Sequence, residues 1–114
     1  MALAKKLREL ILQRDQHCWH CGEVEGLVVH HRINRGMGGS KLLDTPDNLM
    51  AVCSRYNGEM EGVAGVARAA RGWGHKLPSW GDTAHPVFDV CGGSWWVLLP
   101  DGTRVESDWR DQPF

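Results

Sequence analysis

The chain has 114 residues, four cysteines and a formal net charge of −1. This length fits one domain with a modest hydrophobic core. No run of eighteen apolar residues occurs, which excludes a membrane-spanning helix, and a net charge near zero does not give the overall field of an obvious nucleic-acid-binding protein.

The charges are nevertheless divided unevenly along the chain. Residues 1–76 carry eleven Lys and Arg against eight Asp and Glu, whereas residues 77–114 carry two against six. This division is compatible with a basic working face and an acidic appendage, and it also arises by chance on a solvated surface.

The first predicted element is a helix at residues 3–14. Its apolar residues recur at helical spacing and form one stripe, which consists of Leu3, Leu7, Leu10 and Ile11. Basic residues accompany the stripe, but no cleavage-site pattern follows it, so we interpret the segment as a helix and not as a signal peptide. We therefore expect the protein to be cytoplasmic.

The next feature is the segment "HCWHCG" at residues 17–22, in which Cys18 and Cys21 have the two-residue spacing of a zinc knuckle. Such a turn points both sulfurs at one tetrahedral centre. A redox-active pair is the rival interpretation, but it would open a helix, and Gly22 favours a tight knuckle instead. Two plain buried thiols are a third interpretation, and disulfides suit a chain without a secretion signal poorly.

Two short strands and a long loop are predicted next. The segment "GLVVHHRI" at residues 26–33 is rich in β-branched residues and places His30 and His31 at its end. Residues 34–47 have no period and contain three glycines and a proline, which predicts a loop. Loops of this length in small domains are usually functional or disordered. Residues 48–53 form the second predicted strand.

The remaining elements complete an α+β fold. A helix is predicted from a cap at Ser54 to about Arg71. Beyond Gly72, the segments "VFDV", "SWWVLL" and "TRVE" are separated by turn signals, which predicts a small antiparallel meander. We interpret three tryptophans of this region, Trp80, Trp95 and Trp96, as packing of the small sheet.

The order of strand, long loop, strand and helix, with two histidines at the end of the first strand, resembles the HNH endonuclease family. The resemblance is carried by "CWHCG", "LVVHHRINRGMGGS" and "DNLMAVCSRYNGEME", covers about residues 15–62, and is greatest to small HNH proteins of bacteriophages. It implies a ββα-metal core with a zinc-knuckle-like turn in residues 1–76. Residues 77–114 would be a small β appendage packed on the same domain.

The resemblance also implies roles for individual residues. His31 matches the general base, and His30 matches a metal ligand. Asn48 matches the middle asparagine, whose side chain ties the loop to the backbone and helps to fix the base. Asn57 matches the last position of the motif and would be a second metal ligand, which makes this chain an H-N-N variant. Two protein ligands leave room for phosphate oxygens and water, which suits Mg²⁺ or Mn²⁺.

Phosphodiester hydrolysis calls for such residues independently of the resemblance. A water molecule must lose a proton in line with the leaving oxygen, and a cation must take up the developing charge. Histidine suits the role of base at neutral pH. Neighbouring residues of a strand point to opposite faces, so both histidines can serve one site only if the strand ends or bends there. The expected phosphate contacts are Arg32, Arg35, Lys41 and Arg55.

The sequence departs from the family pattern at the zinc site. Many members complete a Cys₄ site with a second cysteine pair. Here Cys53 occupies the first position of that pair, but Tyr56 occupies the second. The remaining sulfurs are those of Cys18, Cys21 and Cys53. A fourth ligand could be Cys91, His17, His20, His75 or His85, and hydrophobic packing without zinc is the alternative. Glu61, where some relatives have a second metal-binding histidine, could hold the ion or remain solvated.

The expected function is that of a phage-encoded, metal-dependent endonuclease that nicks or cleaves DNA in the host cytoplasm. The alternative is a noncatalytic zinc-knuckle module that binds DNA and assists phage packaging proteins. The presence of both His31 and Asn57 favours the enzyme, because DNA binding alone requires neither.

Overall fold

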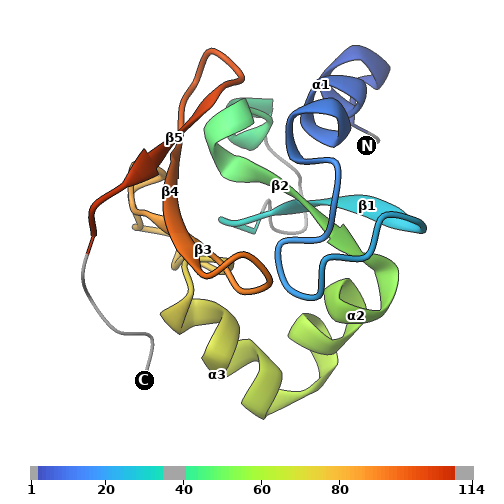
Figure 1. Cartoon of the computed structure of the whole chain (residues 1–114), viewed down its shortest axis with the longest axis vertical. Coiled ribbons are helices and arrows are strands. Elements are labelled where there is room, and N and C mark those ends of the chain that lie inside the picture. Colours follow the sequence, from blue (N-terminus) through green and yellow to red (C-terminus); the bar gives the residue numbers. More distant parts are fainter. Residues whose placement is uncertain (1–2, 35–40, 110–114) are drawn as a thin grey trace.

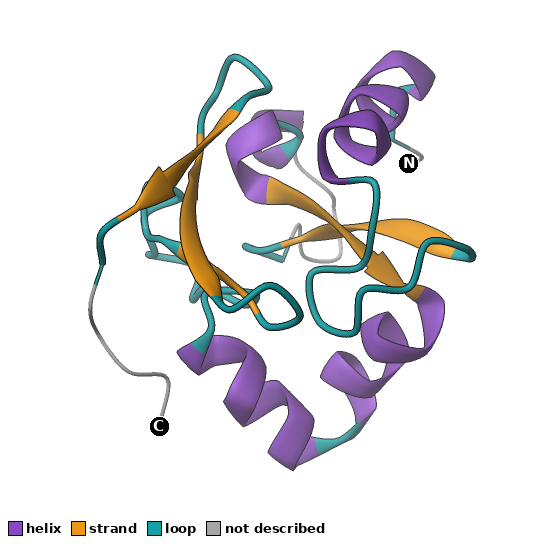
Figure 2. Cartoon of the chain, in the orientation of Figure 1, coloured by secondary structure: helices purple, strands orange, loops and turns teal. Residues whose placement is uncertain are grey.

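The computed structural model describes residues 3–34 and 41–109. In this part of the chain it contains three α-helices and two small antiparallel sheets, which confirms the α+β class (Figures 1 and 2). The elements in chain order are α1 (Lys5–Asp15), β1 (Leu27–His31), the 3-10 helices η1 (Lys41–Leu43) and η2 (Pro46–Asn48), β2 (Leu49–Cys53), α2 (Ser54–Gly62), α3 (Ala64–Gly72), β3 (Val87–Asp89), β4 (Ser94–Leu98) and β5 (Arg104–Ser107). None of these helices is long and apolar enough to cross a membrane.

Strands β1 and β2 correspond to the two strands predicted before the helix, and they pair antiparallel as a hairpin. His30 pairs with Met50 and His31 pairs with Leu49. Every residue of β2 is buried, as its unbroken apolar sequence indicates, whereas most of β1 is half-buried. The hairpin lies between α1 and α2 and contacts both helices (Figure 1).

The single helix predicted for residues 54–71 is in fact two helices. Val63 has extended backbone angles, φ −121° and ψ 112°. Its N–H closes α2 on the carbonyl of Glu59, and its own carbonyl opens α3 by accepting the N–H of Ala67. A β-branched residue after Gly62 favours such a break, because both residues are poor helix formers. The break redirects the chain so that the segment after α3 returns to β1.

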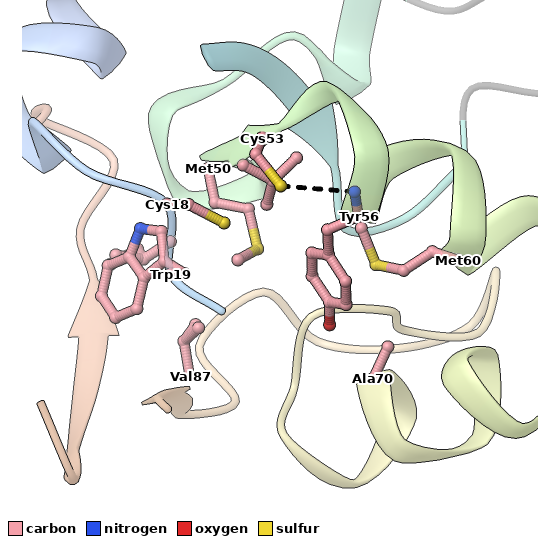
Figure 3. Packing of buried hydrophobic residues seen from close by; sticks show 10 residues of the cluster. Cys18, Trp19, Met50, Cys53, Tyr56, Met60, Ala70 and Val87 are labelled. Carbon is pink, nitrogen blue, oxygen red and sulfur yellow. Dashed lines mark hydrogen bonds between the residues drawn. The ribbon is translucent and has the colours of Figure 1, made fainter. Parts of the chain in front are cut away.

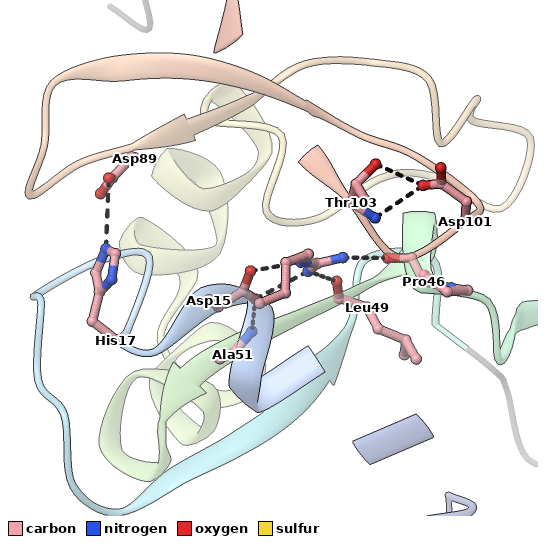
Figure 4. Close-up of polar contacts among 9 residues, drawn as sticks. Asp15, His17, Pro46, Leu49, Ala51, Asp89, Asp101 and Thr103 are labelled. Atoms are coloured by element: carbon pink, nitrogen blue, oxygen red, sulfur yellow. Dashed lines mark hydrogen bonds and ion pairs between the residues drawn. The ribbon is translucent and has the colours of Figure 1, made fainter. Parts of the chain in front are cut away.

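Helix α1 is anchored by its last turn. The Asp15 carboxylate accepts the Ala51 N–H at 2.9 Å, which satisfies a backbone donor of β2, and Arg14 donates to the carbonyls of Pro46 and Leu49 at 2.9 and 2.7 Å (Figure 4). The predicted apolar stripe is only partly buried, because Leu10 is 39% exposed. Polar contacts that cover the β2 edge therefore position α1 as much as apolar burial does.

Strands β3, β4 and β5 form the predicted meander, in that order. Its Val87 and Leu98 belong to the same buried cluster as the cysteine knuckle and α2, so both parts of the chain share one core (Figure 3). Trp95 is 8% exposed and packs as expected. The interpretation of Trp80 as a packing residue is wrong, because it is 86% exposed.

Candidate functional site

A pocket of about 230 Å³ lies where β1 ends beside α2. It is lined by Val29, His30, His31, Asn34, Asn57 and Glu61. Asn57 and Glu61 share one face of α2, since residues four apart are neighbours on a helix surface. The two histidines reach the same pocket although they are adjacent, because β1 ends at His31. The structure thus brings together four of the residues singled out in the sequence, His30, His31, Asn57 and Glu61, and adds Asn34.

His30 is held in one tautomer by the segment that follows α3. Its Nε2 lies 2.8 Å from the carbonyl oxygen of His75. A carbonyl only accepts hydrogen bonds, so Nε2 carries the proton and Nδ1 keeps its lone pair. Burial lowers the pKa of His30 to about 4, so the ring is neutral at neutral pH. A neutral imidazole whose other nitrogen donates to a carbonyl is the usual form of a metal-binding histidine.

His31 is oriented by an acidic residue of the long loop. Its Nε2 lies 2.8 Å from Oδ1 of Asp44, and the two side chains are 18% and 15% exposed. The carboxylate accepts the Nε2 proton, which leaves the lone pair of a neutral His31 on Nδ1. A histidine that is fixed by a hydrogen-bonded carboxylate is a common arrangement for a general base.

Asn48 ties the two ends of the long loop together. The side chain is fully buried. Its Oδ1 accepts the N–H of Ile33 at 2.8 Å, and its Nδ2 donates to the carbonyls of Ile33 and Leu43 at 3.2 and 3.0 Å. This is the loop-to-backbone tie expected for this residue. It fixes the backbone two residues after His31 and one residue before Asp44.

Arg32 does not have the position expected of a phosphate contact, and this prediction is corrected. The residue is 1% exposed. Its guanidinium donates at 2.7 to 3.0 Å to four backbone carbonyls, those of Gly74, Asp47, Thr83 and His85. Arg32 therefore serves as an internal brace between the hairpin and residues 74–85.

Of the three other predicted phosphate contacts, only Arg55 has a side chain among the described residues. Arg35 lies outside the described residues, and so does the side chain of Lys41. Arg55 is at the start of α2 with a side chain that is 68% exposed, 4.0 Å from Glu59. Among the predicted phosphate contacts that the structure places, Arg55 is therefore the one with an accessible guanidinium.

Three cysteines of the knuckle region could bind a metal ion such as zinc. The sulfurs of Cys18, Cys21 and Cys53 all lie within 4.8 Å of one another, and those of Cys21 and Cys53 are 3.7 Å apart. Zinc–sulfur bonds of about 2.3 Å in a tetrahedron place sulfurs about 3.8 Å apart. The donor set and the spacing both fit a tetrahedral zinc ion.

Backbone N–H groups support the same cysteines. His20 and Tyr56 each donate a backbone N–H to a sulfur at 3.3 Å, that of Cys18 and that of Cys53 respectively. Cys53, rather than the expected Ser54, is therefore the cap of α2. Burial raises the pKa of the Cys18 thiol to about 11, so an ion that binds here must displace its proton.

A buried chain of hydrogen bonds connects this centre to the pocket. The Tyr56 hydroxyl lies 2.6 Å from Nδ1 of His75, and Nε2 of His75 lies 2.8 Å from the carbonyl of Phe88. Because that carbonyl accepts, Nε2 carries the proton and Nδ1 accepts from the hydroxyl. Both nitrogens of His75 and the hydroxyl of Tyr56 are thus occupied, while the backbone of His75 fixes His30.

This buried pair of histidines predicts loss of stability in mild acid. Burial lowers the pKa values of His75 and His30 to about 3 and about 4, from 6.5. Below pH 6.5 the unfolded chain takes up protons that the folded chain excludes, so the free energy of unfolding should fall as the pH approaches 4. The difference between 6.5 and 4 corresponds to roughly 3 kcal/mol for one such histidine.

Urea unfolding at several pH values between about 7.5 and 4.5 measures this effect. The His75→Gln variant, which has no imidazole to protonate at this position, should show a flatter dependence on pH. Equal slopes for the two proteins would contradict the assignment of the effect to His75.

Three residues of the site could not be found from the sequence. Asp44 is one acid among several in a loop, and no local pattern pairs it with His31. Asn34 lies within the segment that carries the resemblance but has no role assigned by it, and the sequence indicates His75 only as a possible zinc ligand. Their roles arise from contacts between segments that are distant in the chain.

Comparison of the chain with protein-family models, with curated proteins and with solved structures gives no match. A function for the chain must therefore be argued from the chemistry of the pocket and of the cysteine centre.

Proposed function

We propose that the protein is a metal-dependent endonuclease of the HNH type that hydrolyses DNA phosphodiester bonds. One observation carries this proposal. His31, with Nε2 hydrogen-bonded to Asp44, lines the same pocket as His30, Asn57 and Glu61. A fixed base and a set of metal donors in one pocket are the two components that hydrolysis of a phosphodiester requires.

The donors around the pocket suit a hard divalent cation. His30 would contribute Nδ1, Asn57 its amide oxygen and Glu61 a carboxylate oxygen, and this mixture favours Mg²⁺ or Mn²⁺. Glu61 also lies 3.5 Å from Lys76, and its side chain is 58% exposed. The ion would supply positive charge to the phosphate oxygens and the leaving oxygen.

His31 would take the proton of the attacking water at Nδ1. Its Nε2–H continues to donate a hydrogen bond to Asp44, so the carboxylate both orients the ring and stabilises the positive charge that the ring acquires. Asn48 would act indirectly, by holding the loop that carries Asp44. The β1–β2 hairpin with α2 would then be the ββα-metal core of the enzyme.

DNA would be held mainly through its phosphates. Arg55 is the exposed basic residue beside the knuckle, and its charge would contact the backbone without reading bases. Arg32 contributes to the site by bracing the end of β1.

A nicking assay on supercoiled plasmid DNA tests the proposal. The purified protein should convert supercoiled to open-circular DNA with Mg²⁺ or Mn²⁺, and EDTA should abolish the reaction. Nicked circles should precede linear DNA, because one site cuts one strand at a time. The His31→Ala protein, purified in parallel, controls for contaminating nucleases. Binding of the plasmid without cleavage under all these conditions would contradict the enzyme and support the packaging-associated DNA-binding module.

Replacement of a proposed metal ligand should raise the concentration of Mg²⁺ or Mn²⁺ that nicking requires. Asn57→Ala should shift the midpoint of Mg²⁺ or Mn²⁺ activation to higher concentration, by about 10–100-fold, with activity recovered at excess ion. Glu61→Gln should shift the midpoint in the same direction. Glu59→Gln is the matched control, because Glu59 lies on the same helix and does not line the pocket. An unchanged midpoint in Asn57→Ala would remove this residue from the ion's ligands.

A further inference from the structure

The cysteine centre has three sulfurs where a structural zinc ion takes four ligands. The position that completes the set in the HNH family is Tyr56, and its hydroxyl is engaged by Nδ1 of His75 at 2.6 Å. Figure 3 shows the Tyr56 ring directed away from Cys53, toward Ala70. The fourth ligand must therefore come from another part of the chain.

The turn between β3 and β4 is packed against the knuckle. The N–H of Val90 donates to the carbonyl of Trp19 at 3.0 Å. On the adjoining sheet, the guanidinium of Arg104 lies between the rings of Trp19 and Trp96, 5.1 and 4.4 Å from their centroids. These contacts place Cys91, the residue after Val90, beside the cysteine pair.

The Cys91 thiol lies very close to the backbone of Gly22. A Cβ atom at Gly22 would lie 2.7 Å from Sγ of Cys91, a distance that only glycine permits. Gly22 directly follows Cys21, so the Cys91 thiol lies next to the residue that carries one of the three clustered sulfurs. Asp89 fixes the turn itself by accepting the N–H groups of Gly92 and Gly93, and His17 lies 3.6 Å from its carboxylate (Figure 4).

Three of the four candidate histidines are less suited to the fourth position. The ring of His20 is stacked on Tyr56 with centroids 4.0 Å apart. Its Nδ1 is buried without a hydrogen-bond partner among the described residues, but neither ring nitrogen belongs to the group of ligand atoms within 4.8 Å of one another. Both nitrogens of His75 are hydrogen-bonded. His17 faces Asp89.

We propose that Cys91 is the fourth ligand of a Cys₄ zinc centre with Cys18, Cys21 and Cys53, and that this centre fastens the meander to the hairpin. Cys91 lies outside the group of sulfurs within 4.8 Å of one another, so its side chain changes rotamer when the ion binds. A change of χ1 moves a cysteine sulfur by about 3 Å, and Cys91 is an exposed residue on a turn.

The centre would join three distant parts of the chain, at residues 18–21, 53 and 91. Binding an ion across such separations stabilises the folded state, because the unfolded chain has no preformed site. The inference concerns the metal centre and does not depend on the proposed nuclease activity.

Zinc affinity and the Co²⁺ absorption spectrum test the proposal. Wild-type protein should bind one zinc, and Co²⁺ in its place should give the charge-transfer bands of four thiolates. Cys91→Ser should weaken zinc binding by more than about 100-fold, since even outer partners of a metal site contribute about 10–100-fold, and the Co²⁺ bands should weaken. His20→Phe keeps a stacking ring but cannot ligate, so it should leave both readouts unchanged. Unaltered affinity and spectrum in Cys91→Ser, or their loss in His20→Phe, would overturn the proposal.

A pair of glycine variants tests the close approach. Gly22 and Gly26 both have positive φ, 79° and 66°, but only at Gly22 would an added Cβ contact Cys91. Backbone strain is therefore similar in Gly22→Ala and Gly26→Ala, and only Gly22→Ala should change the zinc affinity, because it alone crowds the Cys91 thiol. Equal effects of the two variants would count against Cys91. A protein with a Cys91-dependent zinc centre and no nicking activity would support this inference and contradict the proposed function.

Discussion

Replacement of His31 by alanine should lower the rate of plasmid nicking by roughly two to four orders of magnitude, which is the contribution of a positioned proton acceptor. DNA binding and metal binding should survive, because the proposed ligand atoms of His30, Asn57 and Glu61 are unaffected. Nicking rates under single-turnover conditions, together with a gel-shift assay, separate the two effects. An active His31→Ala protein would remove the proposed mechanism.

The partner of His31 provides a second variant. Asp44→Asn keeps the size of the side chain but removes the charge that stabilises a protonated His31, so nicking should slow while the fold is retained. The buried His30 is a useful contrast, since His30→Ala should resemble Asn57→Ala in its ion requirement. If Asp44→Asn were as active as the wild type, the hydrogen bond at 2.8 Å would have a structural role only.

Replacement of Arg32 by methionine should prevent stable folding. Its guanidinium satisfies four backbone carbonyls, and a buried acceptor left unpaired costs about 1–3 kcal/mol. The sum, on the order of 5 kcal/mol or more, is comparable with the whole stability of a small domain. Arg32→Lys should recover little, because one ammonium group cannot reproduce the planar set of donors.

Arg55→Ala is the matched control for this effect. Its side chain is 68% exposed, so the free energy of unfolding should change by less than about 0.5 kcal/mol. Plasmid binding by the Arg55→Ala protein should weaken equally for all DNA sequences, with a salt slope reduced by about one. Thermal and urea unfolding of both variants, followed by circular dichroism, measure the contrast. A folded Arg32→Met protein with weakened DNA binding would restore the phosphate contact predicted from the sequence.

The strands β1 and β2 and the meander could be predicted from the sequence because their signals are local. The unbroken apolar run of β2, the short strands and the glycine-containing turns each lie within about ten residues of chain. The spacing of Cys18 and Cys21 likewise predicted sulfurs that face one centre. The helix break at Val63 was missed, because a weak helix former continues a helix where tertiary packing compensates, whereas Val63 is 48% exposed.

The sequence alone indicated which residues are candidates for a functional site: the histidines at the end of β1, the loop asparagine and the cysteines of the knuckle. The tertiary structure decided which way each side chain faces and what it contacts. Arg32 is a residue type that often contacts phosphate. Its hydrogen-bond acceptors here are backbone carbonyls, and those of Gly74 and His85 lie 42 and 53 residues further along the chain. His30 is likewise fixed by a carbonyl 45 residues away. Local patterns cannot specify such partners, because burial and hydrogen bonding between distant segments depend on how the whole chain packs.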